Sequence, residues 1–168
     1  MADAVLYDLA ERAGRALAQR GWMMATAESC TGGWIAEAVT MVPGSSAWFD
    51  RGFVTYTYAS KREMLGVRTE TLERDGAVSI AVVREMIEGA LKASKAQVAV
   101  AVSGTAGPGG GTTEKPVGTV CLAWGIRSAA RRSEVLHFKG DREAVRRQSV
   151  VHVLRVLIEM VGDGAPAN

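Results

Sequence analysis

Apolar residues recur at helical spacing in three stretches of the chain. Near the amino terminus, four of them precede Gly21, a residue type that commonly ends helices: Leu6, Leu9, Ala13 and Leu17. The apolar positions of residues 82–91 follow Ser79, which predicts a capped helix there. A third apolar stripe predicts a last helix over residues 141–161.

Other apolar segments alternate with a period of two or are unbroken, which is typical of strands. Five strands are predicted, at 22–27, 49–57, 96–103, 118–126 and 131–138. The last two are expected to pair antiparallel through a turn at Arg127-Ser128. Shorter helices are predicted at about 32–40, 59–65 and 68–74.

Because strands and helices alternate, the sequence predicts an α/β fold with helices on both faces of one sheet. The length of 168 residues suits one domain, which we place at residues 1–161. Residues 162–168 are expected to form a disordered tail.

Composition and charge exclude several classes of protein. The net charge of +2 is too small to predict nucleic-acid binding, and no run of 18 apolar residues predicts a membrane span. Neither the two cysteines, Cys30 and Cys121, nor the Asp, His and Glu residues have metal-ligand spacing, so no metal is expected. The absence of a signal pattern favours the cytoplasm. The oligomeric state stays open, a homo-oligomer included, because Trp34, Trp48 and Phe49 suit either an interface or a core.

The segment Thr-Ala-Glu-Ser-Cys-Thr-Gly-Gly at residues 26–33 links a predicted strand to a predicted helix. This position places the hydroxyl of Ser29 near free backbone N–H groups at a helix N-terminus. A nucleophile and an oxyanion hole would then share one turn. The amides available for that oxyanion hole belong to Cys30, Thr31, Gly32 and Gly33. The alternative is that Ser29 or Thr31 merely caps the helix.

Lys61 follows the predicted aromatic strand and is flanked by Tyr56 and Tyr58. Partial burial there would lower the pKa of its amine, and only a neutral amine can accept the proton of a serine. Ser29 and Lys61 are therefore the predicted catalytic pair. The alternative is a solvated surface lysine, which is the usual state of this residue type.

Competing nucleophiles and bases are weaker candidates. His137 lies inside a predicted strand and His152 late in the last helix, so both are predicted to be packing or surface residues. Cys30 would need an activating charge to serve as a nucleophile, and we rank it below Ser29.

A glycine-rich loop at residues 104–111 follows the strand that is predicted to be most buried. Ligand crevices of open α/β sheets lie at this position, and glycines let backbone amides approach an anion. The loop lacks the lysine of a phosphate-binding loop and does not open a helix, so neither common nucleotide motif is present. Gly104 and Thr105 are candidate binding residues, and a flexible surface loop is the alternative.

Two arginines one turn apart begin the last predicted helix, Arg142 and Arg146. On one helix face they could present a fork to a phosphate or carboxylate. The alternative is a solvated basic face.

Six segments share their order and content with a known family: AESCTGG at 27–33, PGSSAWFDRGFVTY at 43–56, Lys61 with LGV at 65–67, GAVS at 76–79, SGTAGPGGGTTEKPVGTV at 103–120 and GDREAVRRQ at 140–148. Together they closely resemble the CinA carboxy-terminal domain family, whose stand-alone members are nicotinamide mononucleotide deamidases. The resemblance implies a three-layer α/β/α domain with a mixed, mostly parallel sheet of five strands.

The resemblance also implies hydrolysis of the carboxamide of a small-molecule nucleotide, nicotinamide mononucleotide, to the acid nucleotide and ammonia, without a cofactor. The family's catalytic serine–lysine pair falls on Ser29 and Lys61. Its strand tyrosine falls on Tyr56, which is expected to be a third catalytic residue that passes a proton to the leaving ammonia or orients the lysine. Its threonine contribution falls on Thr105, and its arginine contribution on Arg142 or Arg146.

The chain departs from the family at one position. The family reads Tyr-Ser-Asn before the lysine, whereas residues 56–58 here are Tyr-Thr-Tyr, so a phenol at Tyr58 replaces a carboxamide. Two other functions stay open: a non-catalytic binding module linked to competence or DNA damage, and an amidase for another small carboxamide. The presence of both Ser29 and Lys61 favours an enzyme, because a binding module has no chemical need for that pair.

Overall fold

Five strands form one sheet in the order β2-β1-β3-β4-β5 in the computed structural model, which describes residues 3–162. They are β1 (Met24–Glu28), β2 (Phe49–Val54), β3 (Val98–Gly104), β4 (Thr119–Ile126) and β5 (Arg131–His137). β1 pairs parallel with β2 and β3, whereas β4 pairs antiparallel with β3 and β5. Four strands therefore run in one direction and β4 runs against them. The mixed, mostly parallel sheet is confirmed. Residues 163–168 of the predicted tail lie outside the described residues.

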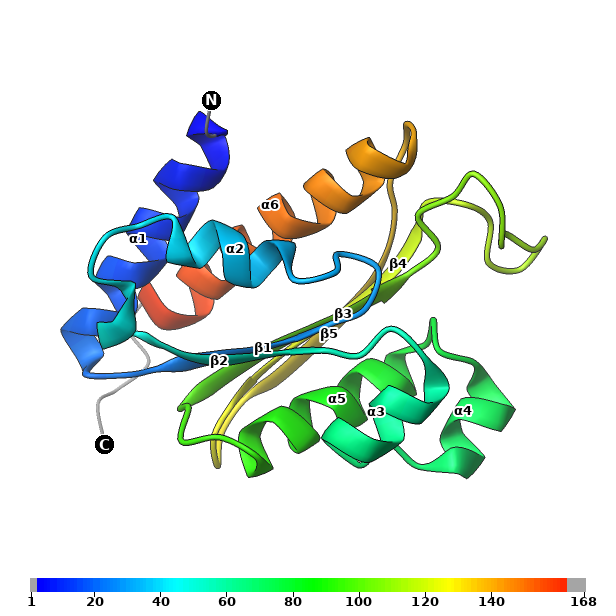
Figure 1. Cartoon of the computed structure of the whole chain (residues 1–168), viewed down its shortest axis with the longest axis horizontal. Coiled ribbons are helices and arrows are strands. Elements are labelled where there is room, and N and C mark those ends of the chain that lie inside the picture. The colour runs from blue at the N-terminus through cyan, green and yellow to red at the C-terminus, as the bar shows by residue number, and fades with distance from the viewer. Residues whose placement is uncertain (1–2, 163–168) are drawn as a thin grey trace.

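Two helical layers enclose the sheet (Figure 1). One layer holds α1 (Ala4–Arg20), α2 (Trp34–Thr40) and α6 (Arg142–Gly162). The other holds α3 (Tyr58–Leu65), α4 (Thr69–Asp75) and α5 (Ile80–Lys92), and a short 3-10 turn, η1 (Ser45–Ala47), leads into β2. The three-layer α/β/α architecture is confirmed. None of the helices within residues 3–162 is long and apolar enough to cross a membrane.

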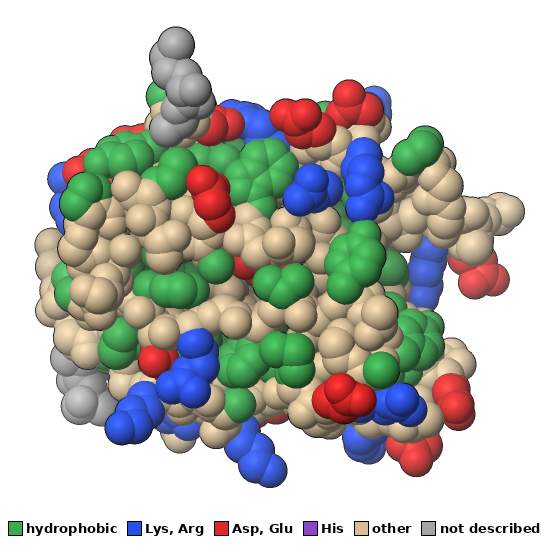
Figure 2. Space-filling model, in the orientation of Figure 1, with side chains coloured by type: hydrophobic (Ala, Val, Ile, Leu, Met, Phe, Trp, Pro, Cys, Tyr) green, Lys and Arg blue, Asp and Glu red, His purple; other side chains and the backbone are tan. Residues whose placement is uncertain are grey.

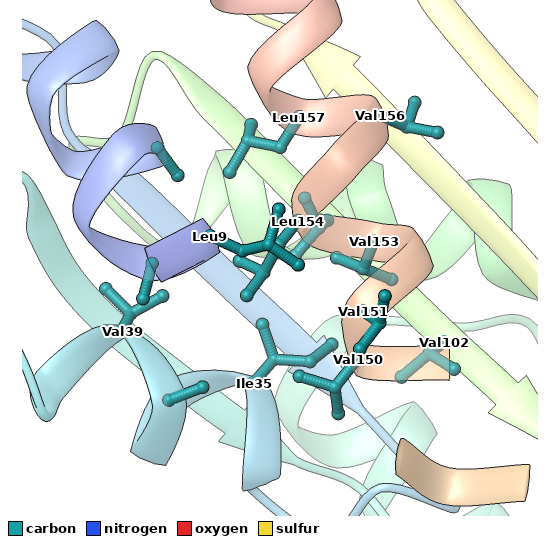
Figure 3. Packing of buried hydrophobic residues seen from close by; sticks show 14 of the residues in the cluster. Leu9, Ile35, Val39, Val102, Val150, Val151, Val153, Leu154, Val156 and Leu157 are labelled. Atoms are coloured by element: carbon teal, nitrogen blue, oxygen red, sulfur yellow. The ribbon is translucent and has the colours of Figure 1, made fainter. Parts of the chain in front are cut away.

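The two faces of the sheet carry side chains of different size. Because side chains alternate along a strand, the valines of β3 point to the layer of α1, α2 and α6, where they meet residues such as Ile35 and Leu154 (Figure 3). Between those valines, Ala99 and Ala101 point to the opposite layer. These small side chains let α5 lie close to the sheet.

The aromatic strand is shorter than the sequence predicts. β2 ends at Val54 instead of Thr57, because Thr57 forms a capping box with Ser60 at the start of α3. The Thr57 hydroxyl accepts from the Ser60 amide at 3.1 Å, and the Ser60 hydroxyl accepts from the Thr57 amide at 3.0 Å. The local cap outweighs the β-propensity of the aromatic residues and starts the helix that carries Lys61.

The aromatic residues left open by the sequence are part of the packing. Trp34, Trp48 and Phe49 are partly buried against the core cluster between α1, α2 and α6. On the face shown in Figure 2, charged side chains gather mainly over the two helical layers, and the band between them is largely hydrophobic or uncharged.

Gly89 fixes the distance between α5 and α3. A Cβ atom at this position would lie 2.0 Å from the carbonyl oxygen of Leu65, at the end of α3. We expect Gly89→Ala to destabilise the protein by about 1–3 kcal/mol through this overlap, although alanine is favoured over glycine in helices by about 1 kcal/mol. Urea unfolding would measure the change. The control is Gly109→Ala, where a Cβ meets nothing within 4 Å, and equal stability losses in both variants would contradict the prediction.

Candidate active site

The carboxyl end of β1 places two neighbouring polar residues on opposite faces of the sheet. Ala27 faces the layer of α5, so by alternation Glu28 faces α2 and Ser29 faces the layer of α3. The amide of Ser29 still donates to the carbonyl of Val102 in β3, at 3.0 Å. Ser29 therefore keeps the direction of the strand although it lies one residue beyond it.

Lys61 reaches Ser29 from α3, in the helical layer that Ser29 faces. Its Nζ lies 2.9 Å from Ser29 Oγ and donates to the carbonyl oxygen of Thr55 at 2.5 Å. Lys61 is 1% exposed and Ser29 is 8% exposed, so water is nearly excluded from the contact. The structure brings together the two residues that the sequence selected as a pair.

The environment of Lys61 favours its neutral form. Burial lowers the pKa of this amine from its ordinary value of 10.5 to about 8, and Cys30 acts in the opposite direction. Roughly a tenth of the amine is then neutral at pH 7. A neutral amine beside a hydroxyl is the arrangement that a serine nucleophile needs.

Glu28, not Ser29 or Thr31, caps α2. The carboxylate of Glu28 accepts from the amides of Gly33, Ile35 and Ala36 at 3.1, 3.0 and 2.9 Å. The predicted capping role of Ser29 or Thr31 is therefore wrong. A glutamate side chain is long enough to fold back from the strand over the helix start, whereas the Ser29 side chain points to the other face.

The helix begins at Trp34, two residues later than predicted, because Gly32 and Gly33 have φ angles of 61° and 98°. This left-handed backbone suits glycine and reverses the chain sharply after Ser29. The reversal brings the start of α2 back to the end of β1, within hydrogen-bond distance of the Glu28 carboxylate.

The turn has two amides left for an oxyanion. The amide of Gly32 donates to the Ser29 carbonyl at 3.0 Å, and that of Gly33 donates to Glu28. The amides of Cys30 and Thr31 donate no hydrogen bond to any other residue that the structure describes. Of the four amides that the sequence predicts as donors, Gly32 and Gly33 have partners within the protein. The amide of Cys30 directly follows the serine.

Arg146 holds the carbonyl side of the same turn. Its guanidinium donates to the carbonyl oxygens of Cys30 at 3.0 Å and Thr31 at 3.1 Å and lies over the ring of Trp34. A cavity of about 370 Å³ beside this turn is lined by Thr31, Gly32, Gly33, Trp34, Glu37 and Arg146.

Burial raises the pKa of the Cys30 thiol to about 11, helped by the charge of Glu28, so Cys30 is a poor nucleophile.

Arg142 links three segments at the rim of the site. It donates to the hydroxyl of Tyr56, which follows β2, at 2.8 Å and to the carbonyl of Gly107 in the glycine-rich loop at 2.9 Å. Tyr56 is 58% exposed and has no hydrogen bond to Lys61. Lys115, which follows the glycine-rich loop, donates from Nζ to the carbonyl of Asp75 at 2.6 Å.

Gly104 and Thr105 lie where β3 leaves the sheet. A Cβ on Gly104 would lie 2.7 Å from Val120 Cγ2, so the glycine allows close pairing with β4. Thr105 exchanges backbone hydrogen bonds with Gly118 and Thr119 at the base of the loop. Both residues lie at the same edge of the sheet as Ser29.

The histidines lie elsewhere. His137, in β5, contacts the Thr119 hydroxyl at 3.2 Å. His152, in α6, contacts the carboxylate of Glu134 in β5 at 2.7 Å. Residues 3–162 contain no group of three or more His, Cys, Asp or Glu side chains that could hold a metal ion.

Sequence reasoning missed two residues of the site. Glu28 was passed over, although a carboxylate just before a helix start is a recognisable capping signal. Thr55 was passed over because its backbone carbonyl, not its side chain, contacts Lys61, and no residue pattern reveals such a contact.

Fold and site together define a class: α/β proteins with a serine hydroxyl and a buried lysine amine in contact at the carboxyl edge of the sheet. The model of the CinA C-terminal domain family matches residues 6–161. The chain belongs to this family, and the resemblance noted in the sequence is confirmed.

The similarity to several named proteins extends over most of the chain. The nicotinamide-nucleotide amidohydrolase PncC of Escherichia coli strain K12 is 53% identical over 157 residues, which span 94% of this chain and 95% of the relative. The protein of the same name from Pseudomonas putida is 55% identical over 152 residues, with 90% and 94% covered. The crystal structure of the competence/damage inducible protein CihA from Agrobacterium tumefaciens has a TM-score of 0.93 and 46% identity, covering 95% of this chain and 98% of its own.

The burial of Lys61 predicts how stability depends on pH. Between pH 8 and 10.5 the unfolded chain holds the Lys61 proton and the folded protein has lost it, so the free energy of unfolding rises with pH. Across this range, the free energy of unfolding of the wild type should rise by about 3 kcal/mol more than that of Lys61→Met. Urea unfolding at several pH values would measure this difference. The control is Lys92→Met, at an exposed lysine, whose free energy of unfolding should depend on pH as that of the wild type does. If the curve of Lys61→Met also parallels the wild type, the shifted pKa is refuted.

Proposed function

We propose that this protein hydrolyses the carboxamide of nicotinamide mononucleotide to nicotinate mononucleotide and ammonia through an acyl-enzyme. The observation that carries the proposal is the 2.9 Å contact between Lys61 Nζ and Ser29 Oγ. The names of the PncC relatives supply the substrate. Their similarity extends over nearly the full length of both chains.

In the first step, neutral Lys61 takes the proton of Ser29 as Oγ attacks the carboxamide carbon. The tetrahedral intermediate collapses when the Lys61 ammonium returns the proton to the amide nitrogen. Ammonia leaves, and the nicotinoyl group remains as an ester on Ser29. Neutral Lys61 then takes a proton from a water molecule as the water oxygen attacks the ester carbon. Lys61 returns this proton to Ser29 Oγ when the bond between Oγ and the acyl carbon breaks, and the released acid loses its proton to solvent.

The amides of Cys30 and Thr31 are the donors for the oxyanion in both steps. An oxyanion-hole donor contributes about 3 kcal/mol where one has been removed from other enzymes. Gly32 and Gly33 act indirectly, because their left-handed backbone directs the preceding amides toward the site.

The nucleotide occupies the rim formed by Tyr56, Thr105 and the glycine-rich loop. Arg142 binds its phosphate: the side chain is exposed, and its present partners, a phenol and one carbonyl, are neutral and exchangeable. Arg146 is less suited, because two carbonyls already hold its guanidinium beside Glu37. Tyr56 contacts the substrate instead of orienting Lys61, since its hydroxyl points to Arg142.

An amidase for another small carboxamide would use the same chemistry, and Tyr58 in place of the family's asparagine is the feature that favours this alternative. A panel of pyridine carboxamides assayed with the wild type separates the two. A non-catalytic binding module, the second alternative, predicts no ammonia release from any of them.

Removal of either member of the pair should abolish hydrolysis. We expect Ser29→Ala and Lys61→Ala each to lower kcat for nicotinamide mononucleotide by at least about 10³-fold, because neither group alone activates the hydroxyl. Ammonia release, with circular dichroism to verify folding, is the measurement. Near-normal turnover in either variant excludes the catalytic pair.

The roles of the two arginines separate in kinetics. Arg142→Ala should raise KM for the nucleotide by about ten- to 100-fold, the loss of a charge-assisted phosphate contact, and should change KM for nicotinamide riboside, which has no phosphate, much less. Arg146→Ala should mainly lower kcat, because the nucleophile turn loses two hydrogen bonds. If Arg142→Ala affects the nucleotide and the riboside equally, the phosphate is bound elsewhere.

A further inference from the structure

Glu28 is the most completely enclosed charged group beside the site. It is 0% exposed, and its Oε2 accepts from Thr31 Oγ1 at 2.6 Å and from the amides of Gly33 and Ile35. Its Oε1 accepts from the amide of Ala36. A buried carboxylate needs such partners to offset the loss of water, and here all of them belong to the turn after Ser29 or to the start of α2.

We propose that Glu28 is a positioning residue that fixes the nucleophile turn, residues 29–33, against Lys61. The inference rests on the proposed function, since it concerns the placement of Ser29 for attack. Glu28 itself touches neither Lys61 nor Ser29 Oγ through any hydrogen bond of the described residues.

The backbone and the side chain of Glu28 anchor the two ends of this turn. Its carbonyl accepts from the amide of Thr55 at 2.8 Å, next to the residue of β2 with which Glu28 is paired. Its carboxylate holds Gly33 and the first turn of α2. One residue therefore closes the loop that carries Ser29, and it ties this loop to Thr55, whose own carbonyl contacts Lys61.

The charge of Glu28 also occupies the positive end of α2. Negative charge is favoured at a helix N-terminus, and this carboxylate already takes the amides that an oxyanion would otherwise meet there. The amides of Cys30 and Thr31 are left for the reaction. Glu28 thereby determines which amides of the turn face the substrate.

The change Glu28→Gln keeps the size of the side chain, removes the charge and, if the amide oxygen keeps the Oε2 position, sets an NH2 group against the Ala36 amide. We expect kcat to fall by about ten- to 100-fold, because small displacements of reacting groups have effects of this size. KM should stay within about twofold, since no substrate contact is lost. The rate at which a small sulfonyl fluoride modifies Ser29, followed by intact mass, should fall in parallel.

Glu85 provides a matched control in the other layer. Its carboxylate accepts from the amide of Arg68, the residue before α4, at 2.8 Å and from Thr71 Oγ1 at 2.7 Å, as Glu28 does for α2. Glu85→Gln should lower the melting temperature but leave kcat and the sulfonyl fluoride rate unchanged. A Glu28→Gln variant with unchanged kcat, or a Glu85→Gln variant with an equal loss, overturns the proposal.

Two further results complete the test. If Glu28→Gln does not fold, Thr31→Val, which removes one of the four hydrogen bonds, should lower kcat several-fold, and unchanged kcat contradicts the proposal. If the wild type releases no ammonia from nicotinamide mononucleotide but Ser29 is still modified, the proposed substrate fails. The role of Glu28 is then decided by the modification rates of wild type, Glu28→Gln and Glu85→Gln.

Discussion

The site depends on one contact between an amine and a hydroxyl, which the surrounding protein encloses almost completely. Lys61 and Ser29 approach within 2.9 Å at the edge of the sheet, each nearly enclosed by protein. Enclosure disfavours the ammonium form, and the carbonyl of Thr55 fixes the direction of the amine. The same burial that makes the lysine costly for stability makes it chemically useful.

The layers of the fold supply the two sides of this contact by different means. The serine is set by the backbone of β1 and its turn, which Glu28 and Arg146 hold through amides and carbonyls. The lysine is positioned by α3, which can pack against α5 at this distance only because Gly89 has no side chain. The rim is more loosely built, because Arg142 joins Tyr56 to the glycine-rich loop through exposed hydrogen bonds.

Much of the fold, and the contact between Ser29 and Lys61, could be predicted from the sequence. Helix periodicity, Gly21 and the unbroken apolar strand are local signals, and in the structure each has the expected form. The Ser29–Lys61 contact is not local, and its prediction relied on the placement of both residues after neighbouring strands and on the family resemblance. The capping by Glu28 was missed because propensity favours serine and threonine at that position, whereas strand alternation turns Ser29 away. The early end of β2 was missed because the capping box at Thr57 competes with aromatic β-propensity.

Ser29 follows a strand of the sheet and Lys61 lies in a helix packed on the sheet, which has a consequence for the protein before it is folded. Ser29 and Lys61 are 32 positions apart in sequence, and nothing local brings them together. On an unfolded or half-assembled polypeptide the amine stays protonated, since its pKa there is the ordinary 10.5, and the alcohol is as inert as any serine. The reactivity that we propose for this pair therefore requires the completed fold, in which α3 is packed against the end of β1.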